Sequence, residues 1–246
     1  FQWNTLDATF YMPTESDGTF PFPTRYTHMA ALATAFEWGR LKMQASVLGY
    51  FVHEKVERFE ARPDKAVATP AFFGSFKVLK NHDLSVRAFY KRMFRMPTFN
   101  DLYYTDMGNA FLKPEYAEQF NVGLKYTRNF EKSPFMRMLD VSVDAYYNKI
   151  TDKIIAYPKG QQFRWTMLNL GEVEIKGVDA VLNALFTLGK LEVTTKFQYT
   201  YQKAIDITDP ADTYYRDQIP YIPWHSGSAI LALFYKGWGL NYSFIY

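Results

Sequence analysis

Hydrophobic and polar residues alternate along most of this chain with a period of two. The clearest example is the segment 139–148, in which Leu, Val, Val, Ala and Tyr alternate with Asp, Ser, Asp, Tyr and Asn. Successive side chains of a β-strand point to opposite sides, so this pattern indicates a strand with one apolar and one polar face. The pattern recurs along the chain, and it predicts about eleven strands and an all-β fold.

Short turns and long loops are predicted to join these strands in strict alternation. An antiparallel up-and-down barrel has this order, whereas the crossovers of a Greek-key sandwich would interrupt it. Gly171 is expected to mark a bulge or bend inside the eighth strand. The short turns are predicted at residues 37–40, 81–83, 131–134, 188–190 and 236–239, and the long loops at residues 13–24, 58–70, 96–115, 158–162 and 204–222.

The composition is compatible with a membrane barrel. It does not support a helical membrane protein, a nucleic-acid-binding protein or a protein with disulfides. Aromatic residues make up 19% of the 246 residues, and no apolar run reaches the roughly 18 residues of a transmembrane helix. A barrel strand needs only about ten residues of alternating polarity to cross a membrane. The net charge of +3, without a Lys/Arg cluster, does not favour nucleic-acid binding. Cysteine is absent, which excludes disulfides and thiolate metal sites.

The apolar and polar faces of the strands are expected to meet different surroundings. Backbone groups in lipid must all be paired, so strands there must close into a barrel, with apolar side chains toward lipid and polar ones toward a wet lumen. A soluble β-sandwich is the alternative, because its strands alternate as well. The lipid-facing set is Leu139, Val141, Val143, Val178, Ala180, Leu182, Val193 and Phe197, the lumen-facing set is Lys125, Asp140, Asp144, Glu192, Lys196 and Gln198, and the aromatic girdle is Trp38, Trp238, Tyr126, Tyr147, Tyr199 and Tyr201.

Two motifs resemble the TonB-dependent outer-membrane receptor family. The first is Arg95-Met-Pro-Thr-Phe-Asn-Asp-Leu-Tyr, followed by Leu112-Lys-Pro-Glu and a strand that contains Phe120-Asn-Val-Gly-Leu. The second is Asp144-Ala-Tyr-Tyr-Asn-Lys-Ile-Thr-Asp, followed by Asn169-Leu-Gly-Glu-Val-Glu-Ile-Lys-Gly-Val-Asp. The resemblance implies that residues 1–246 are part of a β-barrel of about 22 strands. The N-terminal plug, the early strands and the last strands would then lie outside this chain.

The resemblance also implies a function. The parent protein would sit in the outer membrane of a Gram-negative bacterium and bind a scarce nutrient, such as a ferric siderophore-like chelate, cobalamin or a glycan, with its outer loops. Import would use the proton-motive force through the TonB inner-membrane complex, so the expected partners are TonB, the extracellular nutrient and outer-membrane lipid, with no nucleic acid. A passive porin-like barrel and a soluble β-sandwich binding module are the alternatives.

The loop 96–115 is the first candidate for ligand binding, because loops of about twenty residues are usually functional when they are ordered. The alternative for its residues is structural: Arg95 would pair with a carboxylate, and Phe99 and Tyr103 would pack the barrel rim. Haem receptors of the family have a ligand His after a similar Phe-Arg-x-Pro box, and this loop has none. The segment 206–221 is the second candidate. The candidate residues are Arg95, Asn100, Asp101, Tyr103, Tyr104, Asp106, Asn109, Tyr214, Tyr215 and Arg216.

Sequence patterns for catalysis are weak. The four histidines do not have metal-binding spacing, and His225-Ser-Gly-Ser is not a nucleophile elbow. Asp140 and Asp144 are four residues apart on one strand face, which favours a solvated lumen wall over an acid/base pair. We therefore predict no catalytic residue, no metal site and no cofactor.

Overall fold

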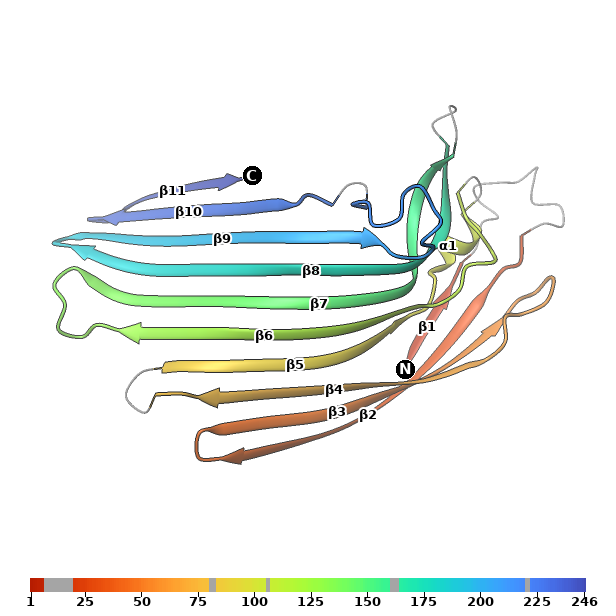
Figure 1. Cartoon of the computed structure of the whole chain (residues 1–246), viewed down its shortest axis with the longest axis horizontal. Helices are drawn as coiled ribbons and strands as arrows, with labels where there is room; N and C mark the ends of the chain where they lie inside the picture. The colour runs from red at the N-terminus through yellow and green to blue at the C-terminus, as the bar shows by residue number, and fades with distance from the viewer. Residues whose placement is uncertain (7–19, 80–82, 105–106, 160–163, 220–221) are drawn as a thin grey trace.

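The computed structural model describes residues 1–6, 20–79, 83–104, 107–159, 164–219 and 222–246. In these ranges, eleven strands form one antiparallel sheet whose order is the order of the chain (Figure 1). This up-and-down topology confirms the predicted all-β fold. A sandwich is excluded, because the described residues contain no second sheet. The strands are β1 (Gln2–Thr5), β2 (Thr24–Trp38), β3 (Leu41–Lys55), β4 (Lys65–Lys77), β5 (Asp83–Arg95), β6 (Glu115–Asn129), β7 (Met136–Lys159), β8 (Arg164–Leu188), β9 (Leu191–Asp206), β10 (His225–Tyr235) and β11 (Trp238–Ile245).

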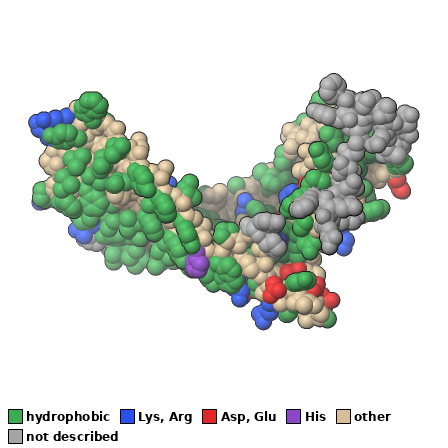
Figure 2. Space-filling model, turned by 90° about the horizontal axis from the view of Figure 1, so that it is seen from above, with side chains coloured by type: hydrophobic (Ala, Val, Ile, Leu, Met, Phe, Trp, Pro, Cys, Tyr) green, Lys and Arg blue, Asp and Glu red, His purple; other side chains and the backbone are tan. Residues whose placement is uncertain are grey.

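The register of the sheet separates an apolar face from a polar face, as the alternation predicted. Val143 of β7 lies opposite Ala180 of β8, and Leu182 of β8 lies opposite Phe197 of β9. Many large side chains of this apolar face are exposed, and Figure 2 shows hydrophobic side chains covering much of one limb of the curved sheet. An exposed apolar surface of this extent is typical of a protein that meets lipid or another protein.

The polar face carries a network of ion pairs and hydrogen bonds. The Nε atom of Arg87 donates to Oδ1 of Asp144 at 3.1 Å. Oδ2 of Asp140 accepts a hydrogen bond from Thr127 at 2.7 Å and lies 3.5 Å from Nζ of Lys125. Both carboxylates are therefore used as parts of a polar wall, as the sequence analysis favoured.

Three of the short turns use residues with positive φ. Gly39 and Gly189 have φ of 58° and 62°, a conformation that glycine adopts without steric cost. The last turn is shorter than the predicted 236–239, because only Lys236 and Gly237 connect the paired residues Tyr235 and Trp238. Their φ values of 46° and 87° match the tight hairpin turn that requires positive φ at both central positions. The predicted turn 81–83 and loop 13–24 lie mostly outside the described residues.

Two prolines lie inside strands, although loops were predicted over residues 58–70 and 158–162. Pro70 belongs to β4, which begins at Lys65, and Pro158 belongs to β7. A proline is tolerated in a strand that has a partner on one side only. This is the case at both positions, since β4 pairs with β5 only from Ala71 onward and β7 pairs with β6 only as far as Thr151.

The strands β4 and β5 consequently separate toward the loop end of the sheet. Residues 65–70 of β4 pair with β3 alone, and residues 92–95 of β5 pair with β6 alone. A cavity of about 320 Å³ lies between the separated strands, with Thr69 on one side and Met93 on the other. The ring centroids of Tyr50 and Phe94 are 5.6 Å apart across this separation.

Two connections fold back over the polar face and bury two hydrophobic clusters. The first, between β5 and β6, contains the short helix α1 (Phe99–Tyr103) where an irregular loop was predicted. The second connects β9 and β10, and β9 continues to Asp206, three residues into the loop predicted at 204–222. The clusters are Phe99, Leu102, Leu112 and Ile154 for the first connection, and Ala117, Ile150, Val173, Ile175, Ala204 and Ile219 for the second.

The loop ends of β7 and β8 bend away from the direction of the other strands (Figure 1). In this region Asp152 of β7 has a φ of 53°. A Cβ atom on Gly171 of β8 would overlap the side chain of Thr208, so glycine is required for the second connection to approach the strand. The expected irregularity at Gly171 is therefore a bend with close packing, and the pairing register of β7 and β8 does not shift there.

Candidate functional site

Helix α1 is fixed at its first turn by a reciprocal capping interaction. Oγ1 of Thr98 accepts a hydrogen bond from the backbone N–H of Asp101 at 3.1 Å. Oδ2 of Asp101 accepts one from the backbone N–H of Thr98 at 2.9 Å. This is the capping-box arrangement, which satisfies two backbone donors that a helix start leaves free. It explains why a five-residue helix forms in a connection that the sequence analysis treated as irregular.

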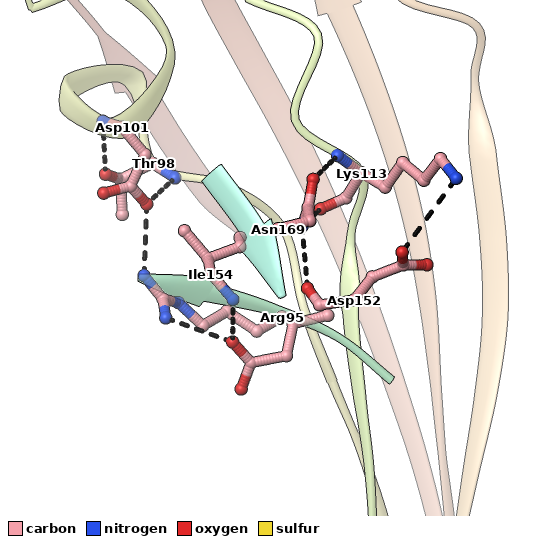
Figure 3. Close-up of polar contacts among 8 residues, drawn as sticks. Arg95, Thr98, Asp101, Lys113, Asp152, Ile154 and Asn169 are labelled. Carbon is pink, nitrogen blue, oxygen red and sulfur yellow. Dashed lines mark hydrogen bonds and ion pairs between the residues drawn. The ribbon is translucent and has the colours of Figure 1, made fainter. Parts of the chain in front are cut away.

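Arg95 joins four elements at the base of this connection (Figure 3). Its guanidinium donates to Oδ2 of Asp101 at 3.1 Å and to Oε2 of Glu115 at 3.5 Å. The same Glu115 oxygen accepts a hydrogen bond from the backbone N–H of Ile154 at 3.0 Å. Arg95 thus connects the end of β5, helix α1, the start of β6 and the bent part of β7. The structural alternative for Arg95, pairing with a carboxylate, is what the protein has.

Asn169 holds the other end of the same connection. Its Oδ1 accepts from the backbone N–H of Lys113 at 2.8 Å, and its Nδ2 donates to the carbonyl oxygens of Lys113 at 3.1 Å and Asp152 at 2.7 Å (Figure 3). The amide of this side chain substitutes for a strand neighbour, since it satisfies both the donor and the acceptor of Lys113. The ammonium of Lys113 lies 4.0 Å from the Asp152 carboxylate.

Asn109 also has a structural position. Its Nδ2 donates to the carbonyl oxygen of Met167 on β8 at 3.0 Å, and its Oδ1 accepts from the backbone N–H of Phe111 at 3.0 Å. Arg62, in the connection between β3 and β4, donates to the carbonyl oxygen of Leu112. Asn109 and Arg62, together with Arg95, Glu115 and Asn169 of the two sequence motifs, therefore form the framework that keeps the connection folded over the polar face.

A buried ion pair lies under α1. The Nε atom of Arg25 on β2 donates to Oε1 of Glu54 on β3 at 2.6 Å, and both side chains are almost completely buried. The Arg25 guanidinium lies 4.8 Å from the centroid of the Phe99 ring. Burial, with the Glu54 carboxylate adding to it, raises the pKa of Tyr103. A cavity of about 480 Å³ borders Arg25, Phe99 and Asn100.

Among the predicted candidates in the β5–β6 connection, two have side chains that are free to face a ligand. Tyr104 is 58% exposed, and Asn100 is exposed beside the cavity. Tyr103 is half-buried and contacts Phe99, as its structural alternative predicted. Phe111, which the sequence analysis did not select, is 92% exposed. The predicted candidate Asp106 lies outside the described residues.

The candidates of the second connection occupy a separate place. Tyr214 is 70% exposed, Arg216 is exposed and Tyr215 is half-buried. The backbone N–H of Arg216 donates to the carbonyl oxygen of Asp206 at 2.7 Å, which closes this segment into a compact loop. The two connections bury different hydrophobic clusters, so the structure does not bring all ten candidates into one site.

Sequence reasoning missed several residues of the framework. Thr98 and Asp101 have the spacing of a capping box, and this signal was available. Glu115 and Asn169 are part of the quoted motifs but received no role. Arg25 had no signal, because its partner Glu54 is 29 residues away and only the strand register places the two side by side.

Two features are absent from the described residues. In those parts of the chain, no group of three or more His, Asp or Glu side chains is placed to hold a metal ion. No helix there is long and apolar enough to cross a membrane.

Comparison with known proteins identifies relatives of known function. The vitamin B12 transporters BtuB of Vibrio vulnificus and of Photobacterium profundum are both 34% identical to this chain, over 99 and 113 residues. These alignments cover 40% and 43% of this chain but only 14% and 16% of the two transporters.

Solved structures show the same fold. The copper transporter OprC superimposes with a TM-score of 0.66 at 18% identity, over 92% of this chain and 35% of that structure. The FrpB iron transporter of Neisseria meningitidis (F3-3 variant) gives 0.59 at 15% identity, over 95% and 34%. A family model described as "TonB dependent receptor-like, beta-barrel" matches residues 1–246. The chain therefore belongs to the TonB-dependent receptor family, and its eleven strands are part of the β-barrel of that family.

Proposed function

We propose that this chain forms part of the barrel wall of a receptor in the outer membrane of a Gram-negative bacterium. The receptor binds a scarce nutrient at its outer loops and imports it with energy supplied through the TonB complex. The plug and the remaining strands of the barrel belong to parts of the parent protein outside residues 1–246. Among a ferric chelate, cobalamin and a glycan, the similarity to vitamin B12 transporters puts cobalamin first.

One observation carries this proposal: the connections β5–β6 and β9–β10 fold over the polar face at the same end of the sheet, while the opposite face is apolar. The apolar face suits lipid, and the polar face suits an aqueous lumen. The framework of Arg95, Glu115 and Asn169 fixes the first connection without using Tyr104 or Asn100. A binding surface on a rigid support, with aromatic and polar groups left free, is what specific recognition requires.

The proposal is tested by uptake measurements on the full-length protein. Cells that express it should accumulate radiolabelled cyanocobalamin, and removal of TonB or addition of a protonophore should abolish accumulation. Retention of uptake without TonB, together with ion conductance in planar bilayers, would instead identify a passive porin-like barrel. Ferric chelates tested in parallel give the ranking of ligand classes.

The loop assignment has its own test. Tyr104→Ala and Tyr214→Ala should each raise the ligand concentration for half-maximal uptake by about tenfold, because a buried aromatic contact is worth roughly 1–2 kcal/mol. Tyr242→Ala is the matched control, since Tyr242 is similarly exposed but lies on the apolar face of β11. Unchanged uptake in both loop variants would remove these residues from the binding surface.

A further inference from the structure

The apolar face changes its chemistry along the strands, toward the end that carries the long connections. Tyr90, Phe120 and Tyr147 lie opposite one another on β5, β6 and β7, with ring centroids 5.0 Å and 6.2 Å apart. One step nearer to the long connections, the cross-strand row is made of charged residues. In order across the sheet, this row is Arg92, Glu118, Lys149 and Glu174. The aromatic row thus borders a charged row on the side of the long connections, and on β5 and β6 a further aromatic pair, Phe94 with Tyr116, follows that charged row.

The aromatic row continues across the sheet into two lysines. Tyr147 lies opposite Lys176 of β8, and Lys176 lies opposite Lys203 of β9. Two like charges directly opposite each other on one face of a sheet are destabilising. The sequence retains them at the edge of the apolar surface, where a bound anion would offset the repulsion.

The surrounding charges leave this lysine pair only partly neutralised. Lys176 pairs with Glu174 at 2.7 Å, and Glu172 is taken by Lys149 at 2.9 Å. Lys203 lies 5.7 Å from the ring of Trp224, and no described carboxylate is within ion-pair distance of it. Across the charged edge, the positive groups outnumber the carboxylates by four to three. The positive groups are Arg92, Lys149, Lys176 and Lys203, and the carboxylates are Glu118, Glu172 and Glu174.

From the two lysines toward the short turns, the surface of β8 and β9 is suited to hydrocarbon chains. On β8 and β9, the next cross-strand pairs of the same face are Val178 with Tyr201, then Ala180 with Tyr199, then Leu182 with Phe197. The rings of Tyr201 and Trp224 are 6.2 Å apart beside Lys203. In a lipid layer the acyl chains are followed by the interface and then by the phosphate groups. The apolar band, the aromatic side chains at its boundary and the cations on the side of the long connections follow the same order.

We propose that Lys176 and Lys203 form a binding site for the phosphate group of an anionic lipid, whose acyl chains lie along the apolar face of β8 and β9. This site is separate from the nutrient-binding loops. It rests on the proposed placement of the apolar face in the membrane. One phosphate carries enough acceptor oxygens to serve both ammonium groups, so its binding removes the repulsion between them.

The test uses the full-length protein in detergent micelles, titrated with diphosphoryl lipid A and followed by native mass spectrometry. Each lysine near an anionic lipid surface contributes a factor of about five in affinity, so Lys176→Gln with Lys203→Gln should weaken lipid A binding by roughly thirtyfold. Lys236→Gln is the control, because Lys236 also lies over a tyrosine ring, at 5.3 Å from Tyr235, but in a short turn. The double arginine variant at positions 176 and 203 should restore binding.

Two additional probes separate the sources of phosphate. Lipid A without its phosphates and inorganic phosphate alone should both bind at least tenfold more weakly than diphosphoryl lipid A. Equal binding of inorganic phosphate would overturn the lipid assignment, and equal lipid A binding by the double glutamine variant would overturn the site itself. Insertion into lipid vesicles is measured on the same samples. Failure of the wild-type protein to insert would overturn the membrane placement, whereas an inserted variant with unchanged binding contradicts the lysine site alone.

Discussion

Replacement of Asn169 by alanine should release the β5–β6 connection without unfolding the sheet. The side chain of Asn169 makes three hydrogen bonds, two with the backbone of Lys113 and one with the carbonyl oxygen of Asp152. Alanine makes none of them. Its own backbone stays within β8, so the pairing of β8 with β7 is retained.

The free energy lost with these three hydrogen bonds depends on how far each bond is exposed to solvent. A typical hydrogen bond contributes about 0.5–1.5 kcal/mol net, and the two bonds with Lys113 are solvent-exposed, which places them at the lower end of that range. The bond with Asp152 is partly buried and is assigned about 1 kcal/mol. The total is about 2 kcal/mol, which corresponds to a roughly thirtyfold larger opening constant for the connection.

Hydrogen exchange with mass spectrometry on the full-length protein measures this opening constant directly. Peptides that cover residues 107–114 should exchange about thirtyfold faster in Asn169→Ala, while peptides from β9 and β10 keep the wild-type rate. Asn100→Ala is the control within the same connection, because its side chain makes no hydrogen bond to the framework within the described part of the chain. Wild-type exchange in Asn169→Ala, or equal acceleration over the whole sheet, would refute the assignment of Asn169 as a local anchor.

Three further outcomes are expected, each with its own measurement. Gly123→Ala should lower the thermal midpoint by several degrees in a melting scan, since the added methyl would overlap the Asp144 carboxylate, while alanine at Gly74, which has open space, should not. Arg25→Met should destabilise the protein by about 3–5 kcal/mol in denaturant unfolding, because the buried Glu54 loses its counter-ion, and adding Glu54→Leu should recover much of the loss. Burial raises the pKa of Tyr103. The contribution of its neutral phenol to the stability of the folded protein is therefore complete below pH of about 10 and is lost as the pH rises through the raised pKa. Difference absorbance of tyrosinate between wild type and Tyr103→Phe should show this late titration; a titration at the ordinary pKa would contradict the burial argument.

The sheet was largely predictable from the chain, because strand alternation and turn chemistry are local properties. The pairs Val143–Ala180 and Leu182–Phe197 fall on one face, as the period of two requires. Two of the misjudged boundaries were at Pro70 and Pro158. Each proline is accommodated because its strand has lost one neighbour, and the loss of a neighbour depends on the register of the whole sheet.

The position of the long β5–β6 connection was predictable from the sequence, but the role of each residue in it was less so. The motif that contains Arg95 and Asp101 correctly located the connection that covers the polar face. Its polar residues, however, are engaged with one another and with Glu115, and such pairings become visible only when β5, β6 and β7 are placed side by side. Exposed residues such as Phe111 carry no sequence pattern that separates them from packed ones.

The separation of β4 from β5 has a mechanical consequence for the rim of the barrel wall. Where a strand has ladders on both sides, the circumference can grow only if backbone hydrogen bonds break. Between residues 65–70 and 92–95 no ladder exists, and side-chain contacts such as that of Tyr50 with Phe94 join the two sides. The rim can therefore widen at this seam for the loss of side-chain contacts alone, while the section nearer the short turns keeps its diameter. This part of the wall, which side-chain contacts alone join, lies at the end that carries the long connections.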